Sequence, residues 1–88
     1  MTRKKITYGD INALLEEEGF KSSPLKGPHV VFRNSEAQAT LVLPDVKSTL
    51  AASRLHLAML RRTLVDFGLL SEEDFDRWSA DPKRFVAA

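Results

Sequence analysis

The apolar positions near the start of the chain recur with the period of a helix. Thr7 precedes them as an N-cap, and Asp10 three residues later completes a short variant of the capping box. Glycine favours the left-handed conformation that ends helices, so Gly19 is the expected stop. The apolar residues at helical spacing between these two signals are Ile11, Leu14 and Leu15.

Short runs of β-branched and aromatic residues in the middle of the chain are typical of strands. The clearest run is 29–33, and 39–43 returns after the polar turn 34–36. A shorter candidate, 20–24, ends at a proline, and the Gly-Pro turn 25–28 follows it. Strands joined by short loops pair antiparallel. The pattern therefore predicts a three-stranded antiparallel sheet.

A long helix is expected after the third strand. Asp45 or Ser48 caps it, and it runs to about Phe67, where Gly68 ends it. Its apolar stripe, which should pack on the sheet, consists of Val46, Leu50, Leu57, Leu60, Leu64 and Phe67.

A second capping signature begins at Ser71 and opens a short helix that carries Phe75 and Trp78. The order of elements predicts an α+β fold of the α-β-β-β-α type, with helices on one face of the sheet and a short extra C-terminal helix. Residues 1–80 are expected to form a single domain, and 81–88 a flexible tail.

Side chains alternate between the two faces of a strand, so the sheet should have a core face and an open face. Phe32, with Val30, marks the core face, and His29, Val31 and Arg33 fall on the open face. On the returning strand, Ala39, Leu41 and Leu43 should point inward, and Thr40 and Val42 outward. Val31 and Val42 are then exposed apolar groups, which predicts a partner interface.

Leu55 and Met59 lie one helical turn apart, off the main apolar stripe. The favoured interpretation is that Phe75 or Trp78 of the last helix covers them. The alternative is an oligomer or partner surface.

Composition limits the possible functions of the chain. Its 88 residues suffice for one domain, and with no cysteine it has no disulfide or thiolate metal site. No apolar run approaches the roughly 20 residues of a membrane helix. The net charge is only +1, so any basic surface must be local.

Three ordered segments resemble one known family. They are a helix ending in Gly19-Phe20, the turn and strand 26–33 with a following strand that ends at Pro44, and the closing segment 62–75. Together they are similar to the HicA (YcfA-like) toxins over roughly residues 7–75. Where that family has Gly-Ser-His at the start of the strand, this chain has Gly27-Pro28-His29.

The resemblance implies a cytoplasmic, mRNA-cleaving toxin with a double-stranded-RNA-binding-like fold, held inactive by a HicB-type antitoxin. It further implies that His29 is the catalytic residue and that no cofactor is needed. Pro28 departs from the family pattern, because proline lacks both the serine hydroxyl and a backbone N–H.

RNA can be cleaved without metal when a base takes the proton of a ribose hydroxyl and a cation stabilises the phosphate. Histidine suits the acid–base role because imidazole ordinarily titrates near neutral pH. Candidate RNA-binding groups around His29 are Lys21, Lys26, Gly27 and Arg33. The alternatives are a surface histidine with no role and a non-catalytic module that binds RNA or protein.

Lys47, Arg54 and Arg61 recur every seven residues and would lie along one side of the long helix. One interpretation is a phosphate-binding stripe, which adds Lys47 and Arg54 to the RNA-binding candidates. The other, slightly favoured, is a solvated face paired with acidic neighbours. His56 is expected to be a solvated or edge histidine, and no metal site is indicated because neither histidine has carboxylates at ligand spacing.

Overall fold

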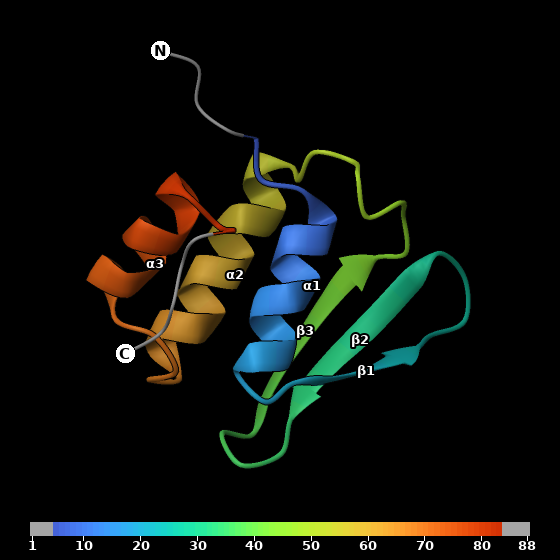
Figure 1. Ribbon diagram of the computed structural model, residues 1–88. Helices are drawn as coiled ribbons and strands as arrows, with labels where there is room; N and C mark the ends of the chain where they lie inside the picture. The colour runs from blue at the N-terminus through green and yellow to red at the C-terminus, as the bar shows by residue number, and fades with distance from the viewer. Residues whose placement is uncertain (1–4, 84–88) are drawn as a thin grey trace.

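The computed structural model describes residues 5–83, which form three helices and one three-stranded antiparallel sheet with strand order β1-β2-β3. The elements are α1 (Tyr8–Glu17), β1 (Lys21–Pro24), β2 (His29–Asn34), β3 (Ala39–Pro44), α2 (Arg54–Asp66) and α3 (Glu72–Ala80). The predicted α+β fold is therefore confirmed. α1 and α2 pack on the same face of the sheet, and α3 packs beside α2 (Figure 1). Most of the predicted tail, residues 84–88, lies outside the described residues.

The predicted ends of α1 are confirmed. The Thr7 hydroxyl accepts a hydrogen bond from the Asp10 N–H at 3.2 Å, and the Asp10 carboxylate accepts one from the Thr7 N–H at 3.0 Å. This reciprocal capping box satisfies two N–H groups that the helix leaves unpaired. At the other end Gly19 has a φ of +89°, the left-handed conformation that glycine adopts without strain.

The core lies between the sheet and the helices. Its side chains come from the inner face of the sheet, from one side of each helix and from two connecting segments. Burying each of the larger ones contributes about 1.5–3 kcal/mol relative to leaving it exposed. The most completely buried members are Ile11, Leu14 and Leu15 of α1, Leu43 of β3, Leu60 and Leu64 of α2, and Trp78 of α3.

The predicted start of α2 is wrong. The helix begins at Arg54 with Ser53 as its N-cap, and residues 45–53 form an irregular segment. The backbone of this segment is hydrogen-bonded to the start of α1, so it is not free to form helical bonds. The bonds are Ala52 N–H to Ile6 carbonyl at 2.8 Å, Tyr8 N–H to Leu50 carbonyl at 3.0 Å and Gly9 N–H to Ser48 carbonyl at 2.9 Å.

Three members of the predicted apolar stripe lie outside the core. Val46 and Leu50 belong to the irregular segment and are 40% and 51% exposed. Phe67 caps the C-terminus of α2 and is 49% exposed. The predicted end of the helix is confirmed by Gly68, which has a φ of +70°.

The predicted α3 is confirmed, but its predicted contact is not. Ser71 caps the helix, and Phe75 and Trp78 are buried with their ring centroids 5.4 Å apart. Neither ring covers the outer side of α2, since Leu55 is 67% exposed and Met59 is 37% exposed. The favoured interpretation of these two residues was therefore wrong.

Asn34 links the end of α1 to the β2–β3 hairpin. Its side chain is buried, and its amide donates to the Glu18 carbonyl at 2.8 Å while its amide oxygen accepts from the Ala37 N–H at 3.0 Å. Both hydrogen-bonding ends of the amide are therefore occupied, as a buried polar group requires.

Replacing Gly9 by alanine should destabilise the protein, although alanine favours a helix by up to about 1 kcal/mol over glycine. A Cβ at this position would lie 3.0 Å from both the Cβ and the carbonyl oxygen of Ser48, so the paired segment must move. We expect a net loss of about 1–3 kcal/mol in chemical denaturation. Asn12→Ala, at an exposed position of the same helix, is the matched control. A Gly9→Ala protein as stable as the wild type would contradict the close approach.

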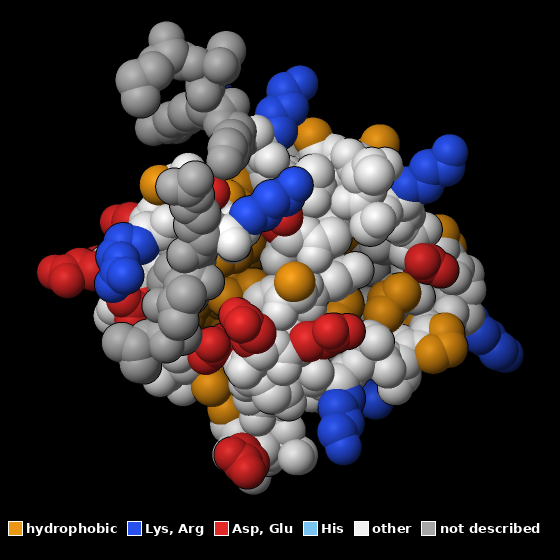
Figure 2. All heavy atoms as spheres, viewed as in Figure 1, with side chains coloured by type: hydrophobic (Ala, Val, Ile, Leu, Met, Phe, Trp, Pro, Cys, Tyr) orange, Lys and Arg blue, Asp and Glu red, His pale blue; other side chains and the backbone are white. Residues whose placement is uncertain are grey.

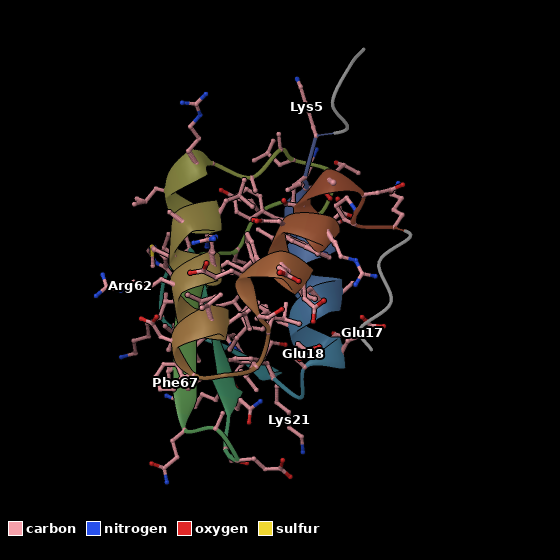
Figure 3. All side chains as sticks on the ribbon, turned by 90° about the vertical axis from the view of Figure 1, so that its left-hand side faces the viewer. Lys5, Glu17, Glu18, Lys21, Arg62 and Phe67 are labelled. Atoms are coloured by element: carbon pink, nitrogen blue, oxygen red, sulfur yellow. The ribbon has the colours of Figure 1, made fainter. Side chains whose placement is uncertain are left out.

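Glu18→Gln should stabilise the protein at neutral pH. Burial, and then the charges of Glu17 and Asp74, raise the pKa of the Glu18 carboxyl above its usual 4.5. The folded state therefore binds this proton more tightly than the unfolded chain, and that stabilisation is lost as pH rises through the folded-state pKa. Figure 3 shows Glu17 and Glu18 together at the end of α1.

The measurement is thermal unfolding from pH 3 to pH 8. The advantage of Glu18→Gln over the wild type should be present at pH 7 and vanish below pH 4.5. Glu36→Gln, which removes a carboxylate in the hairpin turn, is the control. An advantage for Glu18→Gln that is the same at every pH would disprove the electrostatic origin.

Candidate functional site

The face of the sheet turned away from the helices is defined by the strand register. Lys21 of β1 lies opposite Arg33 of β2, which lies opposite Thr40 of β3. Since alternate residues of a strand share a face, rows on this side of the sheet repeat every two residues along each strand. The three rows are Lys21–Arg33–Thr40, Ser23–Val31–Val42 and Leu25–His29–Pro44. We call these nine positions the open face.

His29 is exposed at the start of β2, as the strand pattern predicts. Its backbone is fixed on both sides, because its carbonyl accepts from the Leu25 N–H at 3.0 Å and the Pro28 carbonyl accepts from the Asp45 N–H at 2.8 Å. Gly27, which lies between Leu25 and His29, turns the chain with a φ of +86°. Within residues 5–83 no hydrogen bond or ion pair involves the imidazole. Both ring nitrogens are therefore available to a ligand.

Three cationic side chains lie on or beside the open face. Lys21 and Arg33 are exposed cross-strand neighbours, and neither forms an ion pair with a described residue. Arg33 lies four residues from His29 along β2, which is about 13 Å at a rise of about 3.3 Å per residue. Lys26 is exposed in the turn that leads to His29. The structure therefore places Lys21 and Arg33 on the same side of the sheet as His29, and Lys26 and Gly27 in the turn that precedes it.

None of the nine positions of the open face is acidic, in contrast to the side that the helices cover. On that side acidic side chains lie both near the middle and at the edges, and most lysine and arginine side chains stand at the periphery (Figure 2). A hollow between α1 and α3 is lined by Asp10, Glu16 and Glu17. The open face, which has cations and no acidic position, is therefore the side on which an anionic ligand meets no like charge.

Two other predicted RNA-binding residues do not join the open face. Lys47 lies in the irregular segment 45–53, so the stripe of basic residues along one helix does not exist. Arg54 opens α2 and lines a hollow with Asp76 and Ser79 of α3. Arg61 approaches Glu72 at 3.9 Å and Asp76 at 4.0 Å. The interpretation of a face paired with acidic neighbours is therefore the correct one for Arg61.

The predicted exposure of Val31 is wrong, whereas that of Val42 is confirmed. Val31 is only 3% exposed, and Val42 is 39% exposed. Val31 occupies the centre of the middle strand, where neighbours on the same face surround it. They are Ser23 and Val42 across the strands and His29 and Arg33 along β2.

A hydrogen-bonded cluster around the second histidine was not predicted. The Nδ1 atom of His56 lies 2.7 Å from the Tyr8 hydroxyl and 2.9 Å from the Ser53 hydroxyl. The Tyr8 hydroxyl also accepts from the Ser53 N–H at 3.3 Å, and the two rings meet edge to face at 5.5 Å. These contacts join the start of α1 to the start of α2. The only sequence signal is the N-cap serine three residues before the histidine.

Residues 5–83 contain no group of three or more histidine, cysteine or acidic residues that could hold a metal ion. None of the helices formed by these residues is long and apolar enough to cross a membrane. Comparisons with family models, with curated proteins and with solved structures gave no match.

Tyr8→Phe should destabilise the protein by about 0.5–1.5 kcal/mol, because the ring stays buried but its hydrogen bonds to His56 and Ser53 are lost. A double-mutant cycle with His56→Ala, measured by urea denaturation, tests the contact directly. The two losses should be less than additive, since each variant removes the same hydrogen bond. Strictly additive losses would mean that the hydroxyl and the imidazole act independently.

Proposed function

We propose that this chain is a HicA-type endoribonuclease that cleaves mRNA without a metal ion and uses His29 as its acid–base group. The observation that carries the proposal is the exposed imidazole on the open face, free of partners within the described residues and accompanied by three cations. The resemblance in the sequence around Gly27-Pro28-His29 supports the same residue.

One imidazole suffices for the reaction. His29 takes the proton from a ribose 2′-hydroxyl, and the oxygen forms a bond to the adjacent phosphorus. The bond from phosphorus to the 5′-oxygen breaks, and a water molecule carries the proton from the imidazolium to that leaving oxygen, which departs on the opposite side of the phosphorus. Lys26, in the turn beside His29, offsets the charge on the phosphate. Acid–base catalysis by one group contributes roughly 10²–10⁴-fold, which suits a slow toxin.

Proline at position 28 is compatible with this role. The contribution of residue 28 to the turn is its carbonyl, which accepts from the Asp45 N–H at 2.8 Å and which proline retains. The fixed φ of proline also limits the conformations of the chain immediately before His29. We therefore propose that Pro28 preserves the orientation of the histidine although it lacks the serine hydroxyl of the family.

The same proposal includes a double-stranded-RNA-binding-like fold and a HicB-type antitoxin as the partner protein. The α-β-β-β-α order with both long helices on one face is consistent with a double-stranded-RNA-binding-like arrangement. A HicB-type antitoxin would act in the cytoplasm by covering the open face. Val42 and Leu25, which are 39% and 40% exposed, would supply apolar contacts next to His29.

A non-catalytic RNA-binding or protein-interaction module is the second candidate. One observation favours it: the nine positions of the open face include His29 but no carboxylate, tyrosine or second histidine. Nothing on that face would orient the imidazole or share the proton transfer.

His29→Ala should reduce RNA cleavage by the purified protein at least 10²-fold and abolish growth arrest on expression. Thr40→Ala, on the same face, is the matched control and should retain activity. Circular dichroism of both variants checks that the fold is intact. Cleavage that persists in His29→Ala would remove this residue from the mechanism. RNA binding without cleavage by the wild type would establish the module instead.

A further inference from the structure

We infer that the open face binds the sugar–phosphate backbone of the nucleic acid strand and does not select its bases. The inference rests on the proposed function and names the substrate class of the same site. Sequence-independent recognition has a definite chemical signature: cations for phosphates are present, and the amides, carboxylates and large aromatic rings that read or stack bases are absent. Both parts of that signature can be checked at the nine positions of the open face.

Bases stack most strongly on exposed phenylalanine, tyrosine and tryptophan rings, and the open face has none of these; its one aromatic ring is the imidazole of His29. Five of the described aromatic residues are buried, each with 6% of its surface exposed or less: Tyr8, Phe20, Phe32, Phe75 and Trp78. Phe67, the remaining described one, is exposed at the end of α2 and not on the sheet (Figure 3). Proteins that hold single strands through their bases stack them on such rings. Apart from the single imidazole of His29, the open face offers no ring on which successive bases could stack.

Base edges are read mainly by amide, carboxylate and guanidinium groups. The open face has no asparagine, glutamine or acidic residue among its nine positions. Asn34, on the other face of β2, is buried and already occupied at both ends of its amide. Arg33 has the bidentate guanidinium that pairs with guanine, Lys21 can contact the same base, and the hydroxyls of Ser23 and Thr40 carry no strong preference, so guanosine must be included in any test.

The cations, in contrast, are spaced for a strand that runs along β2. Lys21 and Arg33 form one end of this track, and His29, with Lys26 three residues before it in the turn, forms the other end, about 13 Å from Arg33 along β2. Three phosphate contacts predict that the logarithm of affinity falls with the logarithm of salt concentration with a slope of about −2 for a single strand.

Phosphate contacts do not distinguish RNA from DNA, because the 2′-hydroxyl is the group that does so. In this mechanism the 2′-hydroxyl is needed only when His29 removes its proton. Single-stranded DNA should therefore bind to the open face as well as RNA does, without being cut, and should inhibit RNA cleavage competitively.

The test uses the full-length His29→Ala variant, in which binding is measured without cleavage. Fluorescence anisotropy gives Kd for 12-nucleotide uridine, adenosine and cytidine RNAs, a mixed RNA that contains guanosine, and a thymidine DNA, at several salt concentrations. We expect the five Kd values to agree within about threefold and the slope to be about −2. Lys21→Ala and Arg33→Ala should each weaken all five equally and reduce the slope by about 0.7. Lys47→Ala, a cation off the open face, should change neither.

A preference of more than tenfold for one base, or for RNA over DNA, would overturn the inference. So would a loss of affinity in Phe67→Ala as large as that in Lys21→Ala, since it would show that a base stacks on that ring. If only the catalytic proposal fails, the result is different: His29→Ala binds all five probes as expected, but the wild-type protein cleaves none of the RNAs. Cleavage by the wild type at one particular base would keep the catalytic proposal and refute base-independent binding.

Discussion

The arrangement of the fold depends on backbone hydrogen bonds between the start of α1 and the segment that precedes α2. Residues 48–52 pair with residues 6–9 through three such bonds, and Gly9 permits the approach because it has no Cβ. The Tyr8–His56–Ser53 cluster adds side-chain bonds at the same junction. These contacts hold α2 beside α1 on one face of the sheet, and the other face is left uncovered by the helices of the described chain (Figure 1).

This one-sided arrangement determines where a ligand can bind. The covered face is filled by apolar side chains, and the helices carry acidic groups on their outer surface. The open face has Lys21 and Arg33 in one row and His29 in another, with Lys26 in the adjoining turn. A chain with a net charge of only +1 therefore presents a local basic surface, because its acidic residues lie elsewhere.

The two histidines show how differently the structure treats the same residue type. His56 is held between two hydroxyls at a junction of helices, and its contacts stabilise the fold. His29 has a fixed backbone and a free ring, and no described group restrains it. A restrained imidazole is typical of fast enzymes, whereas a free one on a basic face fits a slow, base-independent nuclease or a binding module.

Local patterns in the sequence determined most of the elements and identified the residues of the site, but not how they are arranged. Three kinds of local signal were sufficient to predict the elements, because each depends on residues close together in the chain. They are the capping box at Thr7, the alternation in 29–33 and 39–43, and the cap at Ser71. Alternation also put His29 and Arg33 on one face. The start of α2, the burial of Val31, the partners of His56 and the pairing of Lys21 with Arg33 were decided only by the tertiary structure. Each of these features depends on contacts between distant segments, which no local pattern encodes. Backbone hydrogen bonds to the start of α1 replaced helical bonds in residues 45–53. Neighbouring strands enclosed Val31.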